Sequence, residues 1–306
     1  MKTGKKLQGP LILLAAAFIW GTTFIAQAKA AEVGLPPLFY NATRMLVGAF
    51  LLFLFLFIRE RKRVWDPLKD KTQRKTLLLG GFLCGLPLCA ATFFQQLGMT
   101  LGTPPGKGAF LTAFYVVLVP VTGIFFKRRV RPLLWIAVAL ALVGMYFLCL
   151  ADFSRPFSET FSFSALSKGD LMMGFSALSF AFQILFVGKY VDACGAVRLS
   201  MMQFFTAGIL SLVAFFFTET LPEGAVFGGA GIWMILYAGV FSCGIAYTLQ
   251  AFGQSKTPPA VASLVMCLES VFALISEMVI FHRSPSPEEW IGSGVLFSAI
   301  VFASLI

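Results

Sequence analysis

The sequence predicts an all-α integral membrane protein whose ten transmembrane helices form a five-plus-five inverted repeat. Of its 306 residues, 58% are hydrophobic and only 12% are charged, whereas a water-soluble domain carries roughly a quarter charged residues. The apolar residues gather in stretches that reach the length of about 20 residues that a helix needs to cross a bilayer. Patterns of the first half also return in the second half in the same order.

Ten apolar stretches meet this length, and short polar or Gly-Pro-rich connections separate them. In chain order they are expected at 10–33, 37–58, 76–99, 106–126, 132–151, 169–191, 199–218, 230–253, 259–281 and 288–306. The first stretch follows three lysines, as a signal peptide would, but it is roughly twice as long as a signal h-region and has no clean cleavage site. We therefore interpret it as the first spanning helix.

The basic residues predict the orientation. With the N-terminus inside, 18 of the 24 Lys and Arg residues fall in cytoplasmic segments and 5 in external loops. The positive-inside rule then predicts a multi-pass protein of the cell membrane with the N-terminus and the C-terminus both cytoplasmic. The net charge of +10 has the same explanation, because the basic residues lie in short loops and form no folded basic domain. The lipid bilayer is thus an expected partner and nucleic acid is not.

Three patterns indicate an internal repeat. The pattern Gln96-x6-Thr103-Pro104-Pro105 returns as Gln250-x6-Thr257-Pro258-Pro259 at an offset of 154, and Trp135-Ile136 returns as Trp290-Ile291 at 155. Earlier in each half, Lys29-x-x-Glu32 returns as Lys189-x-x-Asp192. The two copies are expected at 1–151 and 152–306. Because each has five spans, the second copy enters the membrane from the other side, and such repeats share a site near the midplane and alternate its access. A duplicated scaffold without transport is the alternative.

Polar groups inside the spans are the candidate site residues, because a midmembrane carboxylate is costly and usually functional. Glu269 is the main candidate for binding a substrate amine or exchanging a proton. Glu277 and Arg44 are candidates for coupling or gating, although Glu277 could be interfacial and Arg44 could pair with it or reach a headgroup. The residues expected to bind substrate are Trp20, Gln96, Tyr115, Gln183, Tyr247, Gln250 and Glu269. For each Gln or Tyr, a hydrogen bond between helices is an equally good explanation.

Other chemistries have little support. A single His and six scattered Cys without a C-x-x-C pair make a metal site unexpected, and no cofactor is expected. A membrane-embedded enzyme would need clustered acids or a known motif, and the spans offer only two carboxylates. A channel or a lipid scramblase shares the polytopic architecture and stays an alternative. Protons are a candidate coupling ion, and a monomer and a homodimer are both open.

Several motifs resemble the drug/metabolite transporter superfamily, in particular its ten-helix EamA-type members. Trp20-Gly21-Thr22-Thr23-Phe24 is similar to the W-G-x-x-F signature, and Arg44 stands where the second helix usually carries Arg. Residues 110–120 are similar to a fourth-helix pattern, and Leu268-Glu269-Ser270-Val271 resembles L-E-P-V with Ser in place of Pro. The resemblance covers nearly the whole chain.

The resemblance implies a basket-like bundle in which helices 1, 3, 4, 6, 8 and 9 line a central cavity and helices 5 and 10 lie behind. It also implies transport of metabolites such as amino acids, sugars or nucleobases. Spans one and six lack the acid of the small four-helix relatives, so their cation-exchange mechanism is not carried over. We expect a secondary transporter that exports an amino acid or a similar small amphipathic solute by alternating access.

Overall fold

A computed structural model describes residues 2–61, 64, 66–103, 105–125, 131–149, 167–220, 229–282 and 284–305. Within these residues every regular element is helical. The first half contains α1 (Lys2–Glu32), α2 (Pro37–Glu60), α3 (Asp66–Lys69), α4 (Lys71–Thr100), α5 (Pro105–Ala113), α6 (Tyr115–Phe125) and α7 (Pro132–Cys149). The second half contains α9 (Lys168–Cys194), α10 (Ala196–Thr218), α11 (Ala230–Tyr237), the π-helix η3 (Ala238–Ala246), α12 (Tyr247–Gln254), α13 (Pro259–Met266), α14 (Glu269–Phe281) and α15 (Pro287–Leu305).

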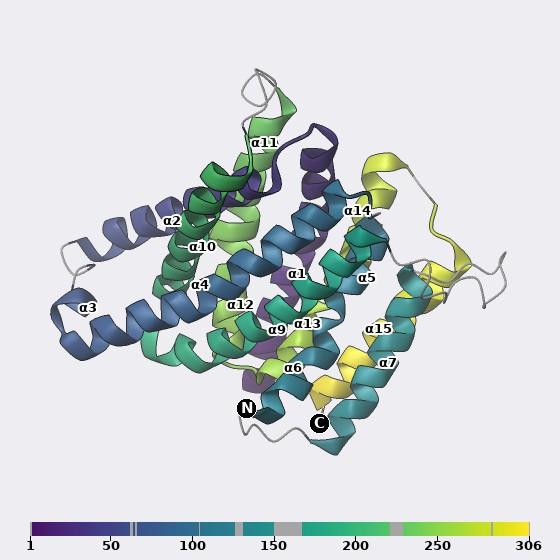
Figure 1. Cartoon of the computed structure of the whole chain (residues 1–306). Coiled ribbons are helices and arrows are strands. Elements are labelled where there is room, and N and C mark those ends of the chain that lie inside the picture. The colour runs from purple at the N-terminus through teal and green to yellow at the C-terminus, as the bar shows by residue number, and fades with distance from the viewer. Residues whose placement is uncertain are drawn as a thin grey trace.

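The helices agree with the membrane fold that the sequence predicts. Eight of them or their continuous runs are long and apolar enough to cross a bilayer, and Pro132–Phe147 is a shorter apolar helix. Each predicted span coincides with one helix or with a consecutive series, and both termini lie at the same end of the bundle (Figure 1). Large apolar side chains such as Ile58, Phe216 and Phe217 point outward, as expected of a surface covered by acyl chains.

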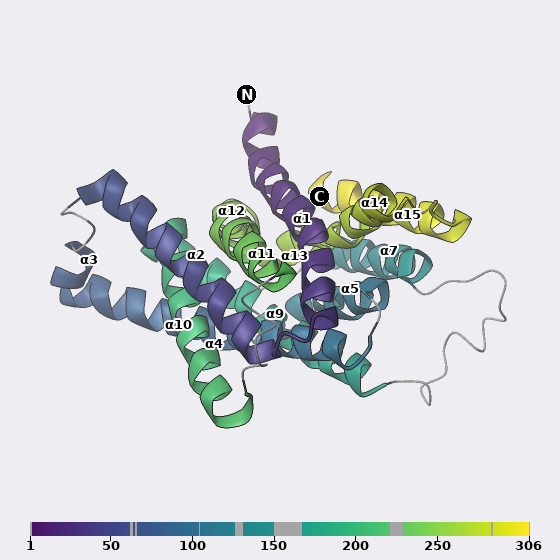
Figure 2. The same cartoon turned by 90° about the horizontal axis from the view of Figure 1, so that it is seen from above.

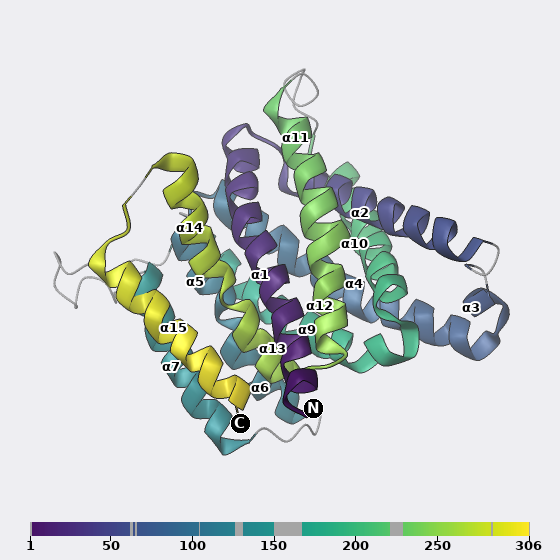
Figure 3. The same ribbon diagram turned by 180° about the vertical axis from the view of Figure 1, so that it is seen from behind.

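Three groups of helices build the bundle. Seen from above, α1, α12 and α13 lie between a group made of α2, α4 and α10 and a group made of α7, α14 and α15 (Figure 2). The view from behind shows α1 between α14 and the column of η3 and α12 (Figure 3). Helices α7 and α15 pack along each other at one edge. Helix α9 also lies near the centre in Figure 2, and both α1 and α9 pack against several other helices. These two helices form the centre of the molecule.

The contacts between helices follow the pattern that an inverted repeat would produce. In the predicted repeat, α1 corresponds to α9, α4 to η3 and α12, and α6 to α14. Helix α4 packs on α9, and the counterparts η3 and α12 pack on α1. Helix α6 also packs on α9, and its counterpart α14 packs on α1. Helix α2 packs on α10, and α7 on α15, so that these helices contact their own repeat counterparts. The inverted repeat itself stays a prediction that this pattern favours.

Two spans that are expected to be continuous helices are interrupted, and the two interruptions lie at positions that correspond to each other in the predicted repeat. The fourth is interrupted at Phe114, between α5 and α6, and the ninth at Cys267 and Leu268, between α13 and α14. At each break, a backbone N–H donates to the oxygen three residues earlier and not to the one four residues earlier, as it would in an α-helix. Phe114 N donates to Leu111 O at 3.4 Å, and Leu268 N donates to Val265 O at 3.2 Å. Neither break holds a Gly or Pro, so the usual sequence signal for a kink is missing.

Glycines allow the helix backbones to approach closely. A Cβ on Gly21 would lie 2.5 Å from Phe272 Cβ, and one on Gly81 would lie 2.6 Å from Met202 Cβ. Such contacts join α1 to α14 and α4 to α10, as small residues commonly do in membrane bundles. Gly21 therefore serves packing, and α1 continues through it without a break.

Candidate substrate site

The helices enclose a cavity in the centre of the bundle. Its walls are formed by Trp20, Phe24, Gln27, Arg44, Gln95, Tyr115, Phe180, Ile184, Ser242, Tyr247, Gln250, Met266 and Glu269. The cavity measures about 30 Å³, which is room for about two water molecules. A metabolite would therefore need the walls to move apart in order to bind there.

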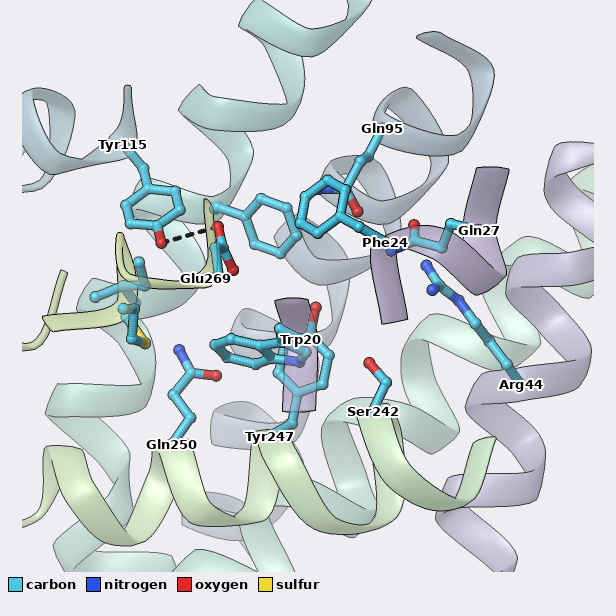
Figure 4. A pocket seen from close by; sticks show the side chains of 13 residues that line it. Trp20, Phe24, Gln27, Arg44, Gln95, Tyr115, Ser242, Tyr247, Gln250 and Glu269 are labelled. Atoms are coloured by element: carbon cyan, nitrogen blue, oxygen red, sulfur yellow. Dashed lines mark hydrogen bonds between the residues drawn. The ribbon is translucent and has the colours of Figure 1, made fainter. Parts of the chain in front are cut away.

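Glu269 is the only carboxylate among the wall residues that the structure describes. It is the first residue of α14, immediately after the break, and its side chain accepts a hydrogen bond from the Tyr115 hydroxyl at 3.2 Å (Figure 4). Tyr115 is the first residue of α6 and follows the other break. The thiol of Cys267 also approaches Ala113 O at 3.7 Å. Both contacts join residues 154 apart, so the two breaks meet at the interface between the halves.

Aromatic rings line the middle of the cavity. Trp20 packs edge-on against Tyr247 with ring centroids 4.7 Å apart, and Tyr247 packs against Phe204 at 5.7 Å. The indole Nε1 of Trp20 and Oε1 of Gln27 are buried without a hydrogen-bond partner among the described residues. Buried polar atoms normally have partners, so both atoms are available to a solute.

Arg44 reaches the cavity from α2. Its side chain is almost completely buried, and its Nε and Nη2 donate to Asn41 Oδ1 at 3.3 and 3.2 Å. The guanidinium also lies 4.9 Å from the ring centre of Tyr40. Figure 4 places Arg44 and Glu269 on opposite sides of the cavity, with Trp20 and Phe24 between them. Among its described residues, the wall thus carries one cation and one carboxylate, which lie apart from each other.

Two residues predicted to bind substrate lie behind the wall. Gln183 exchanges hydrogen bonds with Gln250, at 3.1 and 3.4 Å, and donates to Gln203 at 3.1 Å. Gln96 donates to the backbone oxygen of Gln27 at 3.1 Å and does not line the cavity. Both glutamines bridge helices, which is the alternative that the sequence left open. They support the wall, while Gln250 presents its side chain to the cavity.

The other predicted residues have different outcomes. Trp20, Tyr115, Tyr247, Gln250, Glu269 and Arg44 all line the cavity. Glu277 lies on α14, but its side chain falls outside the part of the chain that the structure describes. Arg44 forms no ion pair with any described carboxylate, and its pairing with Glu277 stays a prediction because that side chain is not described.

Seven wall residues lie outside the set predicted to bind substrate or to couple transport, namely Phe24, Gln27, Gln95, Phe180, Ile184, Ser242 and Met266. A signal existed for Phe24 and Gln27, because they lie four and seven residues after Trp20 and therefore on the same face of α1. Phe180, Ile184 and Met266 look like ordinary core residues. Ser242 belongs to η3, where five-residue bonding changes which side chains face inward.

The comparisons with known proteins identify the family. Residues 7–150 and 167–305 match the EamA-like transporter family. The chain belongs to this family. EamA membership confirms the resemblance drawn from the motifs, and it makes the chain a multi-pass membrane transporter. It also indicates a transporter and not an enzyme.

Relatives with similar sequences also have transporter names. An uncharacterized transporter of Archaeoglobus fulgidus is 29% identical, with 98% of this chain and 87% of that protein covered. The uncharacterized transporter YwfM of Bacillus subtilis is 25% identical, with coverages of 96% and 93%. The uncharacterized inner membrane transporter YedA of Escherichia coli K12 is 24% identical, with coverages of 96% and 89%. A crystal structure at 16% identity matches with a TM-score of 0.75 over 97% of this chain and 96% of that chain, which shows that the two proteins share a fold.

The cavity agrees with the arrangement that the EamA resemblance implied. The first, third, fourth, sixth, eighth and ninth spans all contribute wall residues, and α7 and α15 contribute none. The second span adds Arg44, which the implied set of cavity helices did not include.

Proposed function

We propose that this EamA protein is a secondary transporter that exports an amino acid or a similar small amphipathic solute across the cell membrane by alternating access. The central cavity carries the proposal. Its wall contains the buried Glu269 carboxylate and several aromatic rings, and residues of the wall flank two repeat-related helix breaks. An apolar solute body would contact Trp20, Phe24 and Tyr247. A solute amine would bind at Glu269, where Tyr115 already orients the carboxylate.

The two breaks supply places for motion. Each of them interrupts the hydrogen bonding of a spanning helix, and α6 and α14 can pivot about these points with few bonds lost. Because Tyr115 and Glu269 join the pivots, a solute that takes over the carboxylate would uncouple the two helices. Movement of one half would then open the cavity to one side of the membrane, and movement of the other half would open it to the opposite side. Both termini would be cytoplasmic, as the positive-inside rule predicts.

Counterflow in proteoliposomes tests the proposal. Vesicles loaded with an unlabelled amino acid and diluted into the labelled compound should accumulate label transiently, because a carrier exchanges the two pools. A channel or a scramblase gives simple equilibration without that overshoot. Trp20→Phe removes the Nε1 donor and part of the indole but keeps an aromatic ring in the wall, so it should lower the exchange rate more than it lowers the protein yield.

A matched control separates site from scaffold. Gln96→Leu removes a polar side chain that bonds to the α1 backbone behind the wall, so it should lower yield and exchange in parallel. Parallel losses in Trp20→Phe as well would show that Trp20 is structural. Absence of counterflow for every amino acid, with folded protein in the vesicles, would contradict the proposed function.

A further inference from the structure

The charge of Arg44 is not neutralised within the described part of the chain. Its side chain is 2% exposed, and no described carboxylate forms an ion pair with it. A guanidinium at this depth in a bilayer costs several kcal/mol without a counter-charge or water. Arg residues inside spans therefore usually mark a path for a substrate or an ion.

The guanidinium is oriented, and part of its bonding capacity is free. Both of its recorded hydrogen bonds go to one atom, Asn41 Oδ1. Asn41 is itself held by its Nδ2, which donates to Ser211 Oγ at 2.9 Å, and the Tyr40 ring supports the guanidinium at 4.9 Å. A guanidinium has five N–H donors. The three that do not contact Asn41 form no other geometric hydrogen bond with described residues, although the Tyr40 hydroxyl is close enough to interact with the guanidinium.

These free donors fit a carboxylate. A planar guanidinium binds both oxygens of a carboxylate with two parallel hydrogen bonds, and this geometry is specific as well as strong. Trp20 Nε1, also in the wall and also without a partner, is a further donor for such an anion. Resting on the proposed function, we propose that Arg44 binds the carboxylate of the transported solute, and that the solute must therefore carry one.

The charge balance of the cavity favours a zwitterion among carboxylates. Among the described residues of the wall, Arg44 is the only cation and Glu269 the only carboxylate, and they lie on opposite sides (Figure 4). A solute with one carboxylate and one amine pairs with both, so that no charge stays buried alone. A phosphate would bring up to two negative charges against one cation, with Glu269 adding to the repulsion.

Asn41→Asp provides the decisive variant. The new carboxylate occupies nearly the same volume, accepts the same two bonds from Arg44 and can accept a bond from Ser211. It neutralises Arg44 from within the protein, so the solute carboxylate loses its partner, while the fold loses only the long 3.5 Å bond from Asn41 Nδ2 to Cys89 O. If Arg44 is only structural, the same change should preserve or raise stability and leave ligand binding as in the parent.

Thermal unfolding of the purified full chain measures binding, because a ligand that binds only the folded state raises its stability. The probes are L-leucine and L-phenylalanine, their carboxamides, the corresponding deaminated acids, and inorganic phosphate. We expect stabilisation of the parent by the amino acids, weaker stabilisation by the deaminated acids, and none by the carboxamides or phosphate. Asn41→Asp and Arg44→Gln should lose at least about tenfold in apparent affinity, which corresponds to about 1.4 kcal/mol.

Arg198→Gln is the matched control. Arg198 pairs with Glu60 away from the cavity, so its loss removes an Arg but should not change ligand binding. Arg44→Lys keeps the charge without the planar fork and should bind more weakly than the parent, which provides a second test if another variant fails to fold.

Four results would overturn the proposal: carboxamides that bind as tightly as the acids, phosphate that binds more tightly than the amino acids, parent affinity in Asn41→Asp, or a parent that none of the carboxylates stabilises. The proposed function fails separately. Binding that depends on Arg44 without counterflow would retain the carboxylate site and reject the carrier.

Discussion

Glu269 and Tyr115 illustrate how much of the site depends on single residues. Each is the first residue after a helix break, and their side chains join the two halves through one hydrogen bond of 3.2 Å. The bond lies in the cavity, next to the aromatic wall. A group that both joins the halves and faces the solute is a natural place for coupling.

Replacing Glu269 by Gln tests this role. The amide keeps the size and the bond to Tyr115 but removes the ionisable group, so the variant should fold and lose pH-sensitive transport. Initial exchange rates between about pH 5.5 and 8 cover the range in which a buried carboxyl titrates. Tyr115→Phe removes the hydrogen bond and should lower the rate about tenfold, since bonds to charged groups are worth about 1.5–3 kcal/mol. A Glu269→Gln protein with the parent's rate at every pH would make Glu269 structural.

Contacts between elements close the bundle at the end where α5 and α9 begin. Lys107 of α5 pairs with Asp170 of α9 at 2.6 Å, and Thr103 donates to the same carboxylate at 3.2 Å. Asp170 is 1% exposed and Lys107 33% exposed. Asp170 also closes a capping box with Ser167 at the start of α9. One carboxylate thus serves a helix end and a link between the halves.

Disrupting this link should cost stability. Asp170→Asn leaves Lys107 without its partner and weakens the cap, so the free energy of unfolding should fall by about 1–3 kcal/mol. The cost stays below that of a fully buried pair because Lys107 can turn toward water. Lys107→Gln should lower the free energy of unfolding less in the Asp170→Asn variant than in the parent. A double-mutant cycle measured by thermal unfolding tests this difference. Additive losses would show that the two side chains do not interact.

Glu219 caps α2 from the end of α10. Its carboxylate accepts bonds from Leu38 N at 3.0 and 3.1 Å and from Phe39 N at 3.3 Å, two of the donors that the helix start leaves free. Burial raises the pKa of Glu219 above its usual value, although the bonds from Leu38 and Phe39 oppose the shift. The folded protein therefore favours protonated Glu219 more than the unfolded chain does.

The sign of the pH dependence follows from that direction. A raised pKa in the fold contributes stability below the usual pKa of Glu, and this contribution is lost as the pH rises through the folded pKa. Glu219→Gln removes this term, so the melting temperature of the parent relative to the variant should fall as the pH rises through that range. Glu219→Ala loses the cap and should cost about 1 kcal/mol. If the difference in melting temperature between the parent and Glu219→Gln does not change with pH, the raised pKa of Glu219 is contradicted.

The whole molecule is expected to have one orientation in the membrane. Cysteines introduced at 59–75 and 127–131 should react only with reagents that reach the cytoplasm, and cysteines at 152–168 only with external reagents. The reason is the excess of Lys and Arg in the first two segments. Labelling in intact cells and in inverted vesicles provides the two measurements. Opposite accessibility would reverse the topology, and with it the proposed direction of export.

The sequence by itself determined that the protein lies in a lipid bilayer, that its fold is all-helical, and where along the chain the helices lie. A chain with so few charges must expose its apolar stretches to lipid, and in lipid the backbone can satisfy its hydrogen bonds only in helices or closed barrels. These properties depend on composition and on runs of about 20 residues, which need no knowledge of neighbours. The same local information selected six of the wall residues, because intramembrane polar and aromatic groups are rare enough to stand out.

Only the tertiary structure decided which of these groups face one another. The breaks at Phe114 and Leu268 have no Gly or Pro, and residues 154 apart meet there. Gln96 and Gln183 differ from Gln250 only in the direction in which their helices present them. The rotation of a helix in a bundle is set by packing against its neighbours and not by its own hydropathy. For the same reason, only the tertiary structure could show that no described carboxylate pairs with Arg44.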